Sequence, residues 1–585
     1  MQNMTKIKVG EYLFHRVKEL GVESIFGVPG DYELALLDLV EPCGLSWKGN
    51  ANELVAGYAA DGYARVKGVG CLITTFGPGE LSALNAISGS YAEKLPIIHI
   101  VGYPAMQAIT GKMTIHHTLG NGNYTAYHEM SKHITCADTV LTDLSTVTSE
   151  IDRVLNAAIQ HSQPVYIGVP GDIGQAVIEA IPNLQPLSVE LPTHRSSEEK
   201  RVLEVMSHKV SSIQRPVAII DAGVLRSKSL EGVMAFVEKY NIPFVETSMS
   251  KGAINERHNL FGGHYPGLGT NKETRTLIKD SDCIFWFGPF INDLNTPGAE
   301  SDIRGKVVMM FHRTHIEIDG QEYQVDMKAI LNVLTKKSDA LPLQTTQALR
   351  VPTKPFPDVT PPEGDVIKSD WLMSYVTHLL RPGDVFLTET GTAGINIRRA
   401  YFPENIIHIT QKLWGSIGYA TGAALGSFIA ANEIGPPKHK RNILFTGEGS
   451  FQMTAQAFGD YSRYNTNGYI FIINNSGYTI ERAIHGANAT YNDVASWNYQ
   501  LLPQFFDSTG SHPFRTYQIH TPQQFHDLLF NDPDFRVPDK LRVIEIFTGK
   551  HDYGEVLHAA GPAGDRFNLG GIGREEFKEE KKKSR

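Results

Sequence analysis

The sequence predicts an α/β protein built from three doubly wound, parallel-sheet domains. Its 585 residues are enough for several domains, and 41% hydrophobic with 20% charged residues is an ordinary globular composition. Short apolar, β-branched runs alternate with helical patterns along the chain, as in parallel strands that are buried on both faces. Two segments rich in proline, serine and charge, 182–200 and 340–365, interrupt this alternation and predict linkers.

The expected domain boundaries follow from these linkers. We expect a first domain at 5–182, a middle domain at 200–340, a third domain at 365–555 and a charged tail at 556–585. Each block contains three or four apolar runs bounded by glycine or proline. They predict strands within 70–77, 95–104 and 164–170, then 215–223, 242–248 and 281–290, then 381–390, 441–450, 469–478 and 540–549.

Charge and cysteine usage exclude several classes of protein. The formal net charge of −9 argues against a protein that binds nucleic acid by neutralising phosphates. No stretch approaches 18 apolar residues, so neither a spanning helix nor a membrane partner is expected. The four cysteines are scattered without a CxxC pair, which indicates neither a disulfide framework nor a zinc site. A reducing compartment, most simply the cytoplasm, is the expected location.

Glycine-rich segments follow several of the predicted strands. Parallel sheets bind ligands at the carboxyl ends of their strands, and glycines allow the backbone to approach a ligand closely. Within 441–450 a strand runs into Gly447-Glu448-Gly449-Ser450, and the next strand of that block ends in Asn474-Asn475. Carboxylate and amide oxygens that meet beside backbone N–H groups suit Mg²⁺ bridged to a diphosphate. The sequence therefore predicts a magnesium–diphosphate site in the third domain.

With these segments and others, the chain resembles the thiamine-diphosphate-dependent 2-oxoacid decarboxylase family, of the pyruvate and indolepyruvate decarboxylase type. The resemblance runs from about residue 5 to 555, with the motifs in the family's order. Its third-domain motifs are GEG followed by NN, NSGYTIE at 475–481, IHG at 484–486 and YND at 491–493. Its first-domain motifs are GVPGD at 27–31, NANEL at 50–54, AADGYAR at 59–65, TFG at 75–77, GELSA at 79–83 and IHHTLGNG at 115–122.

The resemblance implies a reaction and a set of catalytic groups. The expected reaction is the non-oxidative decarboxylation of a 2-oxoacid to an aldehyde and CO₂ with thiamine diphosphate and Mg²⁺, because the cofactor's thiazolium acts as an electron sink. Glu53 is expected to hydrogen-bond the cofactor's pyrimidine nitrogen. Asp31, His116 and His117 are expected to relay protons, and Glu481 to favour departure of the carboxylate and to assist protonation.

The resemblance also implies which residues hold the cofactor. Glu448, Asn475 and the Gly477 carbonyl are expected to bind the metal ion. The loop at 414–417 is expected to keep the cofactor bent, with the Gly415 carbonyl accepting a hydrogen bond and Ile417 lying between its rings. The full set of expected cofactor contacts is Thr390, Thr392, Gly415, Ser416, Ile417, Gly449, Ser450, Asn475, Tyr478, Thr479 and Ile480. Because these residues and Glu53 fall in different domains, which meet across subunits in this family, a homo-oligomer is implied: at least a dimer, and commonly a tetramer.

The chain departs from the family pattern in four places. Glu448 stands where the family has Asp, which is expected to alter metal affinity. A shortened segment at 390–396 and Leu294, in a place where pyruvate-specific members tend to have Phe, favour a roomier pocket, so the expected substrate is pyruvate or a bulkier aromatic or branched 2-oxoacid. Gly223 occupies the place of the cysteine found in substrate-activated members, so hyperbolic kinetics are expected.

Three other functions remain as alternatives. A carboligase would form an acyloin from the same intermediate with the same residues, and product analysis with added aldehyde separates the two reactions. A catalytically silent relative has only the Glu448 substitution in its favour. A nicotinamide enzyme is the weakest alternative, because no GxGxxG follows the first strand.

Overall fold

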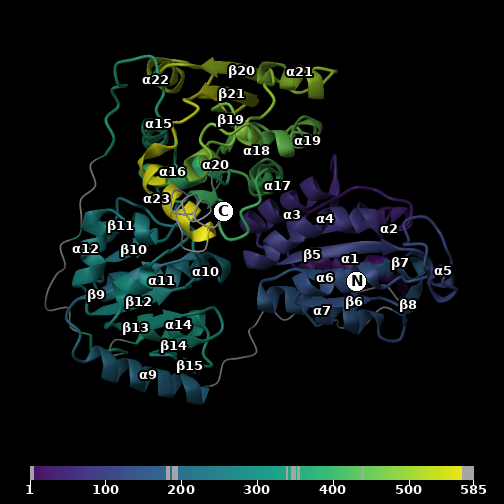
Figure 1. Cartoon of the computed structure of the whole chain (residues 1–585). Coiled ribbons are helices and arrows are strands. Elements are labelled where there is room, and N and C mark those ends of the chain that lie inside the picture. The colour runs from purple at the N-terminus through teal and green to yellow at the C-terminus, as the bar shows by residue number, and fades with distance from the viewer. Residues whose placement is uncertain are drawn as a thin grey trace, which may run out of the picture.

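A computed structural model of the chain describes residues 6–179, 185–187, 196–337, 340–343, 351, 356–436 and 440–569. Three sheets with helices on their faces form three bodies that follow one another along the chain (Figure 1). The prediction of three α/β domains is confirmed.

The first domain is built on a six-stranded parallel sheet with the strand order β3-β2-β4-β5-β7-β6. Its strands are β2 (Ser24–Gly27), β3 (Ser46–Gly49), β4 (Gly70–Thr75), β5 (Ile97–Tyr103), β6 (Ala137–Val140) and β7 (Val165–Pro170). A short antiparallel pair joins β1 (Lys6–Lys8) to β8 (Val177–Glu179). The helices are α1 (Val9–Glu19), α2 (Leu34–Leu37), α3 (Glu53–Lys67), α4 (Pro78–Ala92), α5 (Met106–Thr110), α6 (Ala126–Ser131), α7 (Val147–His161) and α8 (Gly171–Gln175).

The middle domain has a seven-stranded sheet with the order β11-β10-β9-β12-β13-β14-β15. Its strands are β9 (Pro216–Ile220), β10 (Phe244–Glu246), β11 (Phe261–His264), β12 (Cys283–Phe287), β13 (Val307–Phe311), β14 (Ile316–Ile318) and β15 (Gln321–Tyr323). The first five are parallel, but β14 and β15 are antiparallel, so this sheet departs from the fully parallel prediction at one edge. The helices are α9 (Ser196–Val210), α10 (Ala222–Arg226), α11 (Leu230–Lys239), α12 (Lys272–Asp280), α13 (Ala299–Ile303) and α14 (Met327–Lys336).

The third domain has a six-stranded parallel sheet with the order β17-β16-β18-β19-β21-β20. Its strands are β16 (Val385–Thr388), β17 (Ile407–Ile409), β18 (Asn442–Gly447), β19 (Gly468–Asn474), β20 (Phe514–Ile519) and β21 (Leu541–Phe547). Its helices are α15 (Ser369–Tyr375), α16 (Thr392–Asn396), α17 (Tyr419–Ile434), α18 (Glu448–Met453), α19 (Ala457–Arg463), α20 (Thr479–Ile484), α21 (Leu502–Phe506), α22 (Pro522–Phe530) and α23 (Gly554–Asn568).

The structure differs from two boundary expectations. The expected tail at 556–585 begins instead with α23 (Gly554–Asn568), which packs against α20, α16 and α15 of the third domain. The rest of that tail, from 570, lies outside the described residues. The expected linker at 182–200 overlaps the start of α9 at Ser196. In the described part of the chain, no helix has both the length and the apolar character needed to cross a bilayer.

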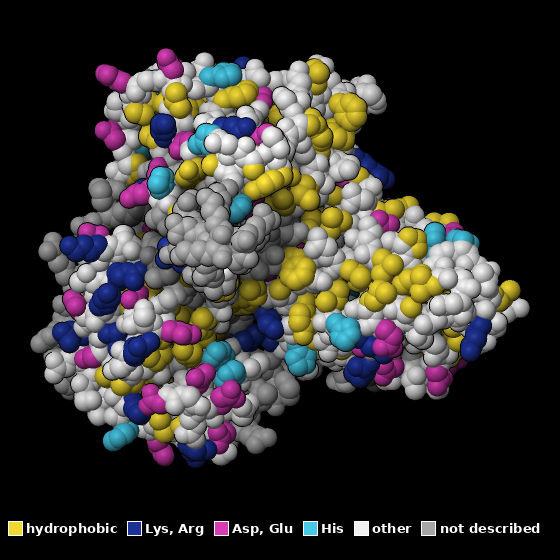
Figure 2. Space-filling model, in the orientation of Figure 1, with side chains coloured by type: hydrophobic (Ala, Val, Ile, Leu, Met, Phe, Trp, Pro, Cys, Tyr) yellow, Lys and Arg dark blue, Asp and Glu magenta, His cyan; other side chains and the backbone are white. Residues whose placement is uncertain are grey.

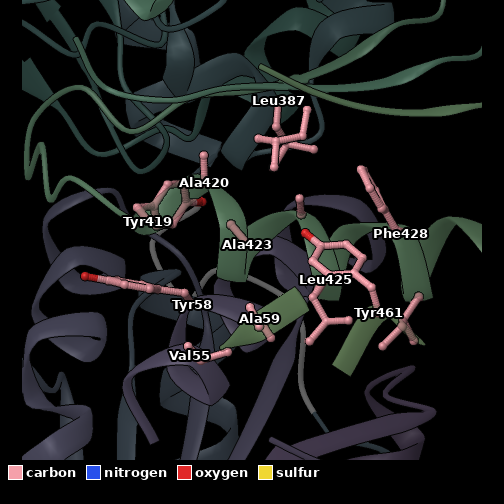
Figure 3. Close-up of a cluster of buried hydrophobic side chains, with 14 of the residues drawn as sticks. Val55, Tyr58, Ala59, Leu387, Tyr419, Ala420, Ala423, Leu425, Phe428 and Tyr461 are labelled. Atoms are coloured by element: carbon pink, nitrogen blue, oxygen red, sulfur yellow. The ribbon is translucent and has the colours of Figure 1, made fainter. Parts of the chain in front are cut away.

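The first and third domains share one topology and one core. Numbered within their own sheets, both have the strand order 2-1-3-4-6-5. In both, a long helix follows the second strand, α3 in one and α17 in the other, and these two helices pack against each other. Figure 3 shows Val55, Tyr58 and Ala59 of α3 facing side chains of α17, with Tyr461 of α19 beside them. The two domains are therefore joined through their equivalent helices.

The crossing of α3 and α17 depends on small residues. A Cβ atom added at Gly426 would lie 1.8 Å from the backbone oxygen of Ala59, and one added at Gly62 would lie 1.9 Å from that of Ala423. The backbones of the two helices thus touch at these points, which only glycine allows.

We predict that Gly426→Ala destabilises the protein by about 1–3 kcal/mol, the usual range for overpacking a close-packed core. The added methyl group forces the two helix backbones apart, and calorimetry should detect a lower thermal midpoint. Gly232→Ala is the matched control, because this helical glycine of α11 has its nearest neighbour, Leu331, at 3.4 Å. A Gly426→Ala protein as stable as wild type would contradict the close packing.

Candidate functional site

A cavity of about 510 Å³ lies at the carboxyl ends of β16, β18 and β19, three neighbouring strands of the third sheet. This is the edge at which parallel sheets bind ligands. Most of the expected cofactor and metal residues line it: Thr390, Thr392, Ile417, Glu448, Gly449, Ser450, Asn475, Gly477, Tyr478, Thr479 and Ile480. Glu481, the expected third-domain catalytic group, lines the same cavity.

Glu448 and Asn475 end neighbouring parallel strands and meet as predicted. Oε1 of Glu448 accepts hydrogen bonds from the backbone N–H groups of Asn475, at 3.2 Å, and Gly477, at 2.6 Å. Oε2 of Glu448 and Oδ1 of Asn475 are buried and have no hydrogen-bond partner among the described residues. Burial raises the pKa of the Glu448 carboxyl to about 7. Two buried oxygens without donors are a suitable ligand pair for Mg²⁺, so the residues fit the implied metal even with Glu in place of Asp.

The backbone at Gly477 has a conformation that favours glycine. Its φ is +127°, and a Cβ atom there would lie 2.1 Å from the carbonyl oxygen of Asn492. This conformation turns the Gly477 N–H toward Glu448, while the Gly477 carbonyl accepts from the N–H of Thr479 at 2.9 Å. Gly477 therefore shapes the turn that brings the segment 475–481 over the cavity.

Hydrogen bonds hold the loop at 414–417, whose Ile417 lines the cavity. Ser416 donates its N–H to Oε1 of Gln411 at 2.8 Å, and its hydroxyl lies 2.6 Å from that of Tyr58 in α3. Gly415 has a φ of +63°, and only Ile417 of the expected loop residues lines the cavity. Gly415 and Ser416 do not line the cavity, so their expected roles stay predictions.

Sequence analysis missed two residues: His485, which lines the third-domain cavity, and Glu389, which accepts a hydrogen bond from the cavity-lining Thr390. The fully buried Glu389 accepts from the N–H groups of Thr390, at 2.9 Å, and Ala420, at 3.1 Å, and burial raises its pKa to about 7. His485 lines the cavity four positions beyond Glu481, and its Nδ1 lies 2.8 Å from Oδ1 of Asp565 in α23. The position of His485 one helical turn from Glu481 was a usable signal, whereas its contact with Asp565 was not visible in the sequence.

The first domain gathers a second group of predicted residues. Nε2 of His116 lies 2.8 Å from Oδ2 of Asp31, and Nε2 of His117 lies 3.9 Å from Oδ1 of the same carboxylate. These three side chains are 59%, 31% and 50% exposed for His116, His117 and Asp31 respectively. The fold thus brings a carboxylate from 85 positions away in the chain to the histidine pair, the grouping that the resemblance implies.

Aromatic residues hold this histidine pair in place. The ring of Tyr32 stacks on His116 with centroids 4.9 Å apart, and its hydroxyl donates to the His116 carbonyl at 3.0 Å. His117 has a φ of +66°, which is unusual for a residue other than glycine. The Tyr127 hydroxyl donates to its carbonyl at 3.0 Å and helps to hold that backbone.

Glu53 opens helix α3 as its first residue. Oδ1 of Asn52 caps this helix by accepting from the N–H of Val55 at 2.8 Å, as expected for an asparagine N-cap. The Glu53 side chain is partly exposed, and its carboxylate lies beside Gly79 at the start of α4. The capped start of α3 therefore fixes the position of the Glu53 carboxylate.

Within one chain, the two groups of residues do not form a single site. In the described part of the chain, all residues that line the third-domain cavity belong to the third domain, and Glu53, Asp31, His116 and His117 are not among them. Within one chain, the two domains are joined instead through α3 and α17. We call these two separate groups of expected residues the half-sites.

Three family models match the chain in succession. They are the thiamine pyrophosphate enzyme N-terminal TPP binding domain at residues 7–123, the central domain at 204–336 and the C-terminal TPP binding domain at 389–529. The chain belongs to the thiamine pyrophosphate enzymes. Each half-site of this thiamine pyrophosphate enzyme falls largely within a domain whose family description is TPP binding, and the sheet with the antiparallel edge is the central domain.

Relatives of this thiamine pyrophosphate enzyme extend over nearly its whole length. It is 38% identical over 547 residues to pyruvate decarboxylase isozyme 1 of Saccharomyces cerevisiae, covering 93% of this chain and 96% of the relative. It is 39% identical over 551 residues to the pyruvate decarboxylase of Kluyveromyces marxianus and over 548 residues to that of Aspergillus fumigatus, in both cases covering 93% of this chain and 95% of the relative. The predicted resemblance to the pyruvate decarboxylase family is confirmed.

Two of the departures from the family pattern, Gly223 and Leu294, lie in the middle domain. A Cβ atom at Gly223 would lie 2.7 Å from Cα of Gly288, so these two backbones touch and leave no room for a side chain. Leu294 is 47% exposed and does not line the third-domain cavity of its own chain. Its expected effect on the pocket therefore stays a prediction.

Proposed function

We propose that this enzyme decarboxylates a 2-oxoacid without oxidation, releasing an aldehyde and CO₂, with thiamine diphosphate and Mg²⁺ as cofactors. The observation that carries the proposal is the third-domain cavity, which Glu481 lines together with Glu448 and Asn475, whose buried oxygens lack hydrogen-bond partners among the described residues. Relatives named pyruvate decarboxylase over almost the full length support the same reaction.

Each part of the chain would contribute a separate task. Glu448 and Asn475 would hold the metal ion, with the cavity-lining threonines and glycines around the diphosphate. When bound, thiamine diphosphate supplies the electron sink for the bond that breaks. Glu481 would act at the substrate carboxylate, and the Asp31, His116 and His117 group would pass protons between the pocket and solvent.

We propose that the two half-sites are completed by a second copy of the chain, in at least a dimer and commonly a tetramer. Exposed apolar side chains lie near both half-sites: Met453 (52%) and Tyr491 (65%) at the cavity, and Met113 (47%) and Leu119 (55%) beside the histidine pair. Figure 2 shows hydrophobic side chains running from the third domain toward the first on one face. Such patches are typical of surfaces that another protein covers.

Mixing two inactive variants tests this shared site. In a one-to-one population of Glu53→Gln and Glu481→Gln chains, about a quarter of the sites in randomly formed symmetric dimers should combine an intact Glu53 with an intact Glu481. We therefore expect the coexpressed mixture to recover about a quarter of the wild-type activity. If each site formed within one chain, every site would carry a substitution and the mixture would stay inactive.

We also predict hyperbolic kinetics, free of activation through a thiol at the family's regulatory position. Gly223, packed on Gly288, offers no sulfur there, and the four cysteines are unpaired and mostly buried. Initial rates measured against 2-oxoacid concentration check this prediction. A sigmoidal curve that becomes hyperbolic after thiol blocking would contradict it.

Unpaired cysteines also support our proposal of a reducing compartment, the cytoplasm.

The proposed reaction is tested by a coupled assay for aldehyde over a panel of 2-oxoacids, from pyruvate to branched-chain and indole derivatives. Aldehyde and CO₂ in equal amounts from at least one acid would support the proposal, and no turnover of any acid would overturn it. Repeating the assay with added aldehyde identifies the carboligase alternative, because that activity would convert the acid to an acyloin instead.

A further inference from the structure

The middle domain carries a second cluster of histidines and carboxylates, remote in the sequence from both half-sites. His312 and His315 flank the tight turn between β13 and β14, which closes with the His312 N–H donating to the His315 carbonyl at 2.9 Å. Glu317 follows in β14, and Glu322 lies in β15. The three strands lie side by side at one edge of the middle sheet (Figure 1).

Strand alternation places all four side chains on one face of this hairpin. Successive side chains of a strand point to opposite faces. Phe311, Ile316, Ile318 and Tyr323 are buried in the core of the middle domain. Their neighbours, His312, His315, Glu317 and Glu322, therefore point to the other face. Glu317 and Glu322 are direct cross-strand partners, an arrangement of like charges that destabilises a sheet unless a positive charge lies between them.

The distances within the cluster are close to those of a metal site. The two imidazole rings stack with centroids 4.2 Å apart. Nε2 of His312 lies 3.6 Å from Oε2 of Glu317, and Nε2 of His315 lies 3.8 Å from Oε1 of Glu322. One ligand atom from each of His312, His315 and Glu317 falls within 4.8 Å of the others.

The surroundings of the histidine nitrogens are typical of histidines that bind a metal ion. Nε2 of His312 is buried and has no hydrogen-bond partner among the described residues. Nδ1 of His315 lies 3.2 Å from the Thr314 hydroxyl, which leaves Nε2 facing the carboxylates. A hydrogen bond at one ring nitrogen is how proteins orient the other toward a metal. Because buried polar atoms are normally satisfied, the unpartnered nitrogen calls for an explanation.

We propose that His312, His315 and Glu317, with Glu322 beside them, form a binding site for a borderline divalent cation such as Zn²⁺. Two imidazoles with one or two carboxylates are a donor set for Zn²⁺, whereas Mg²⁺ prefers oxygen ligands alone. The ion would neutralise the Glu317–Glu322 pair and tie the turn to β14 and β15.

The position of the turn gives the site a consequence for the arrangement of domains. Arg313, between the two histidines, donates to the backbone carbonyls of Ile159 and Gln160 at the end of α7 in the first domain. A cation that fixes the turn would therefore strengthen a contact between the middle and first domains, without touching the cavity of the third domain.

Calorimetric titration with ZnCl₂ tests the site on the full chain, loaded with thiamine diphosphate and Mg²⁺. We expect wild type to bind one more equivalent of Zn²⁺ than the His312→Gln/His315→Gln variant, and Zn²⁺ to raise the thermal midpoint of wild type by more than that of the variant. Glu317→Gln should weaken the binding at least about tenfold. Any Zn²⁺ held by Asp31, His116 and His117 is common to all these proteins and cancels in the comparison.

The matched control is His208→Gln, which removes a single exposed histidine of α9 in the same domain and should change nothing. The thermal midpoint of each metal-free variant shows whether the substitution itself unfolds the chain. If the double variant is unfolded, the single variant His315→Gln replaces it in the comparison. Equal stoichiometry and affinity for Zn²⁺ in wild type and in the folded histidine variant would overturn the proposal. Because the readout is binding, failure of the proposed decarboxylation would not affect it.

Discussion

Replacing Glu53 by glutamine is expected to lower kcat by about 100- to 10,000-fold, the range for loss of a positioned acid–base group. Glutamine keeps the length of the side chain at the first position of α3, and the Asn52 cap that starts this helix remains. The substitution removes a carboxyl group that can hold and release a proton where the first domain would face the cofactor. Steady-state assays with the best acid of the panel measure the effect.

The control for Glu53 is Glu129→Gln, an exposed glutamate of α6 that pairs with Lys132 at the surface. It should retain wild-type activity. Circular dichroism and thermal melting should be the same for both variants. A Glu53→Gln enzyme with kcat within about threefold of wild type would show that this carboxylate takes no part in catalysis.

Glu481→Gln is expected to lower kcat by about 100-fold or more while cofactor binding stays within about threefold of wild type. Glu481 is an exposed residue that lines the cavity from the first turn of α20, so its replacement removes charge without disturbing the core. The Glu448 and Asn475 oxygens that would bind the metal ion are unchanged. Titration with thiamine diphosphate and Mg²⁺, followed by aldehyde release, separates binding from turnover.

Glu404→Gln provides the comparison for Glu481, because Glu404 is an exposed glutamate of the third domain that does not line the cavity. Its turnover and cofactor affinity should both match wild type. Unchanged aldehyde release by Glu481→Gln would remove Glu481 from the mechanism, and lost cofactor binding would assign it to the cofactor site instead.

The sequence was most informative where local pattern determines structure. The apolar runs before Gly447 and Asn475 formed β18 and β19, and neighbouring parallel strands brought Glu448 and Asn475 together as predicted. Hydrophobic periodicity identifies such strands because burial on both faces demands continuous apolar residues.

Contacts between distant segments were less accessible. Periodicity cannot show that Asp31 meets His116, or that Asp565 of α23 meets His485. The charged composition near the C-terminus favoured a tail, yet α23 buries one side against the third domain. The polar hairpin of β14 and β15 was also missed, since three-residue strands are too short to display a period.

The packing of α3 on α17 has a consequence for folding during synthesis on the ribosome. Helix α3 ends at Lys67, but its partner begins only at Tyr419. At about 5–20 residues per second, synthesis leaves the apolar face of α3 uncovered for roughly 20–70 s. In the nascent chain, the face of α3 that packs on α17 therefore stays exposed throughout the synthesis of the middle domain. During this interval the chain most needs protection from aggregation.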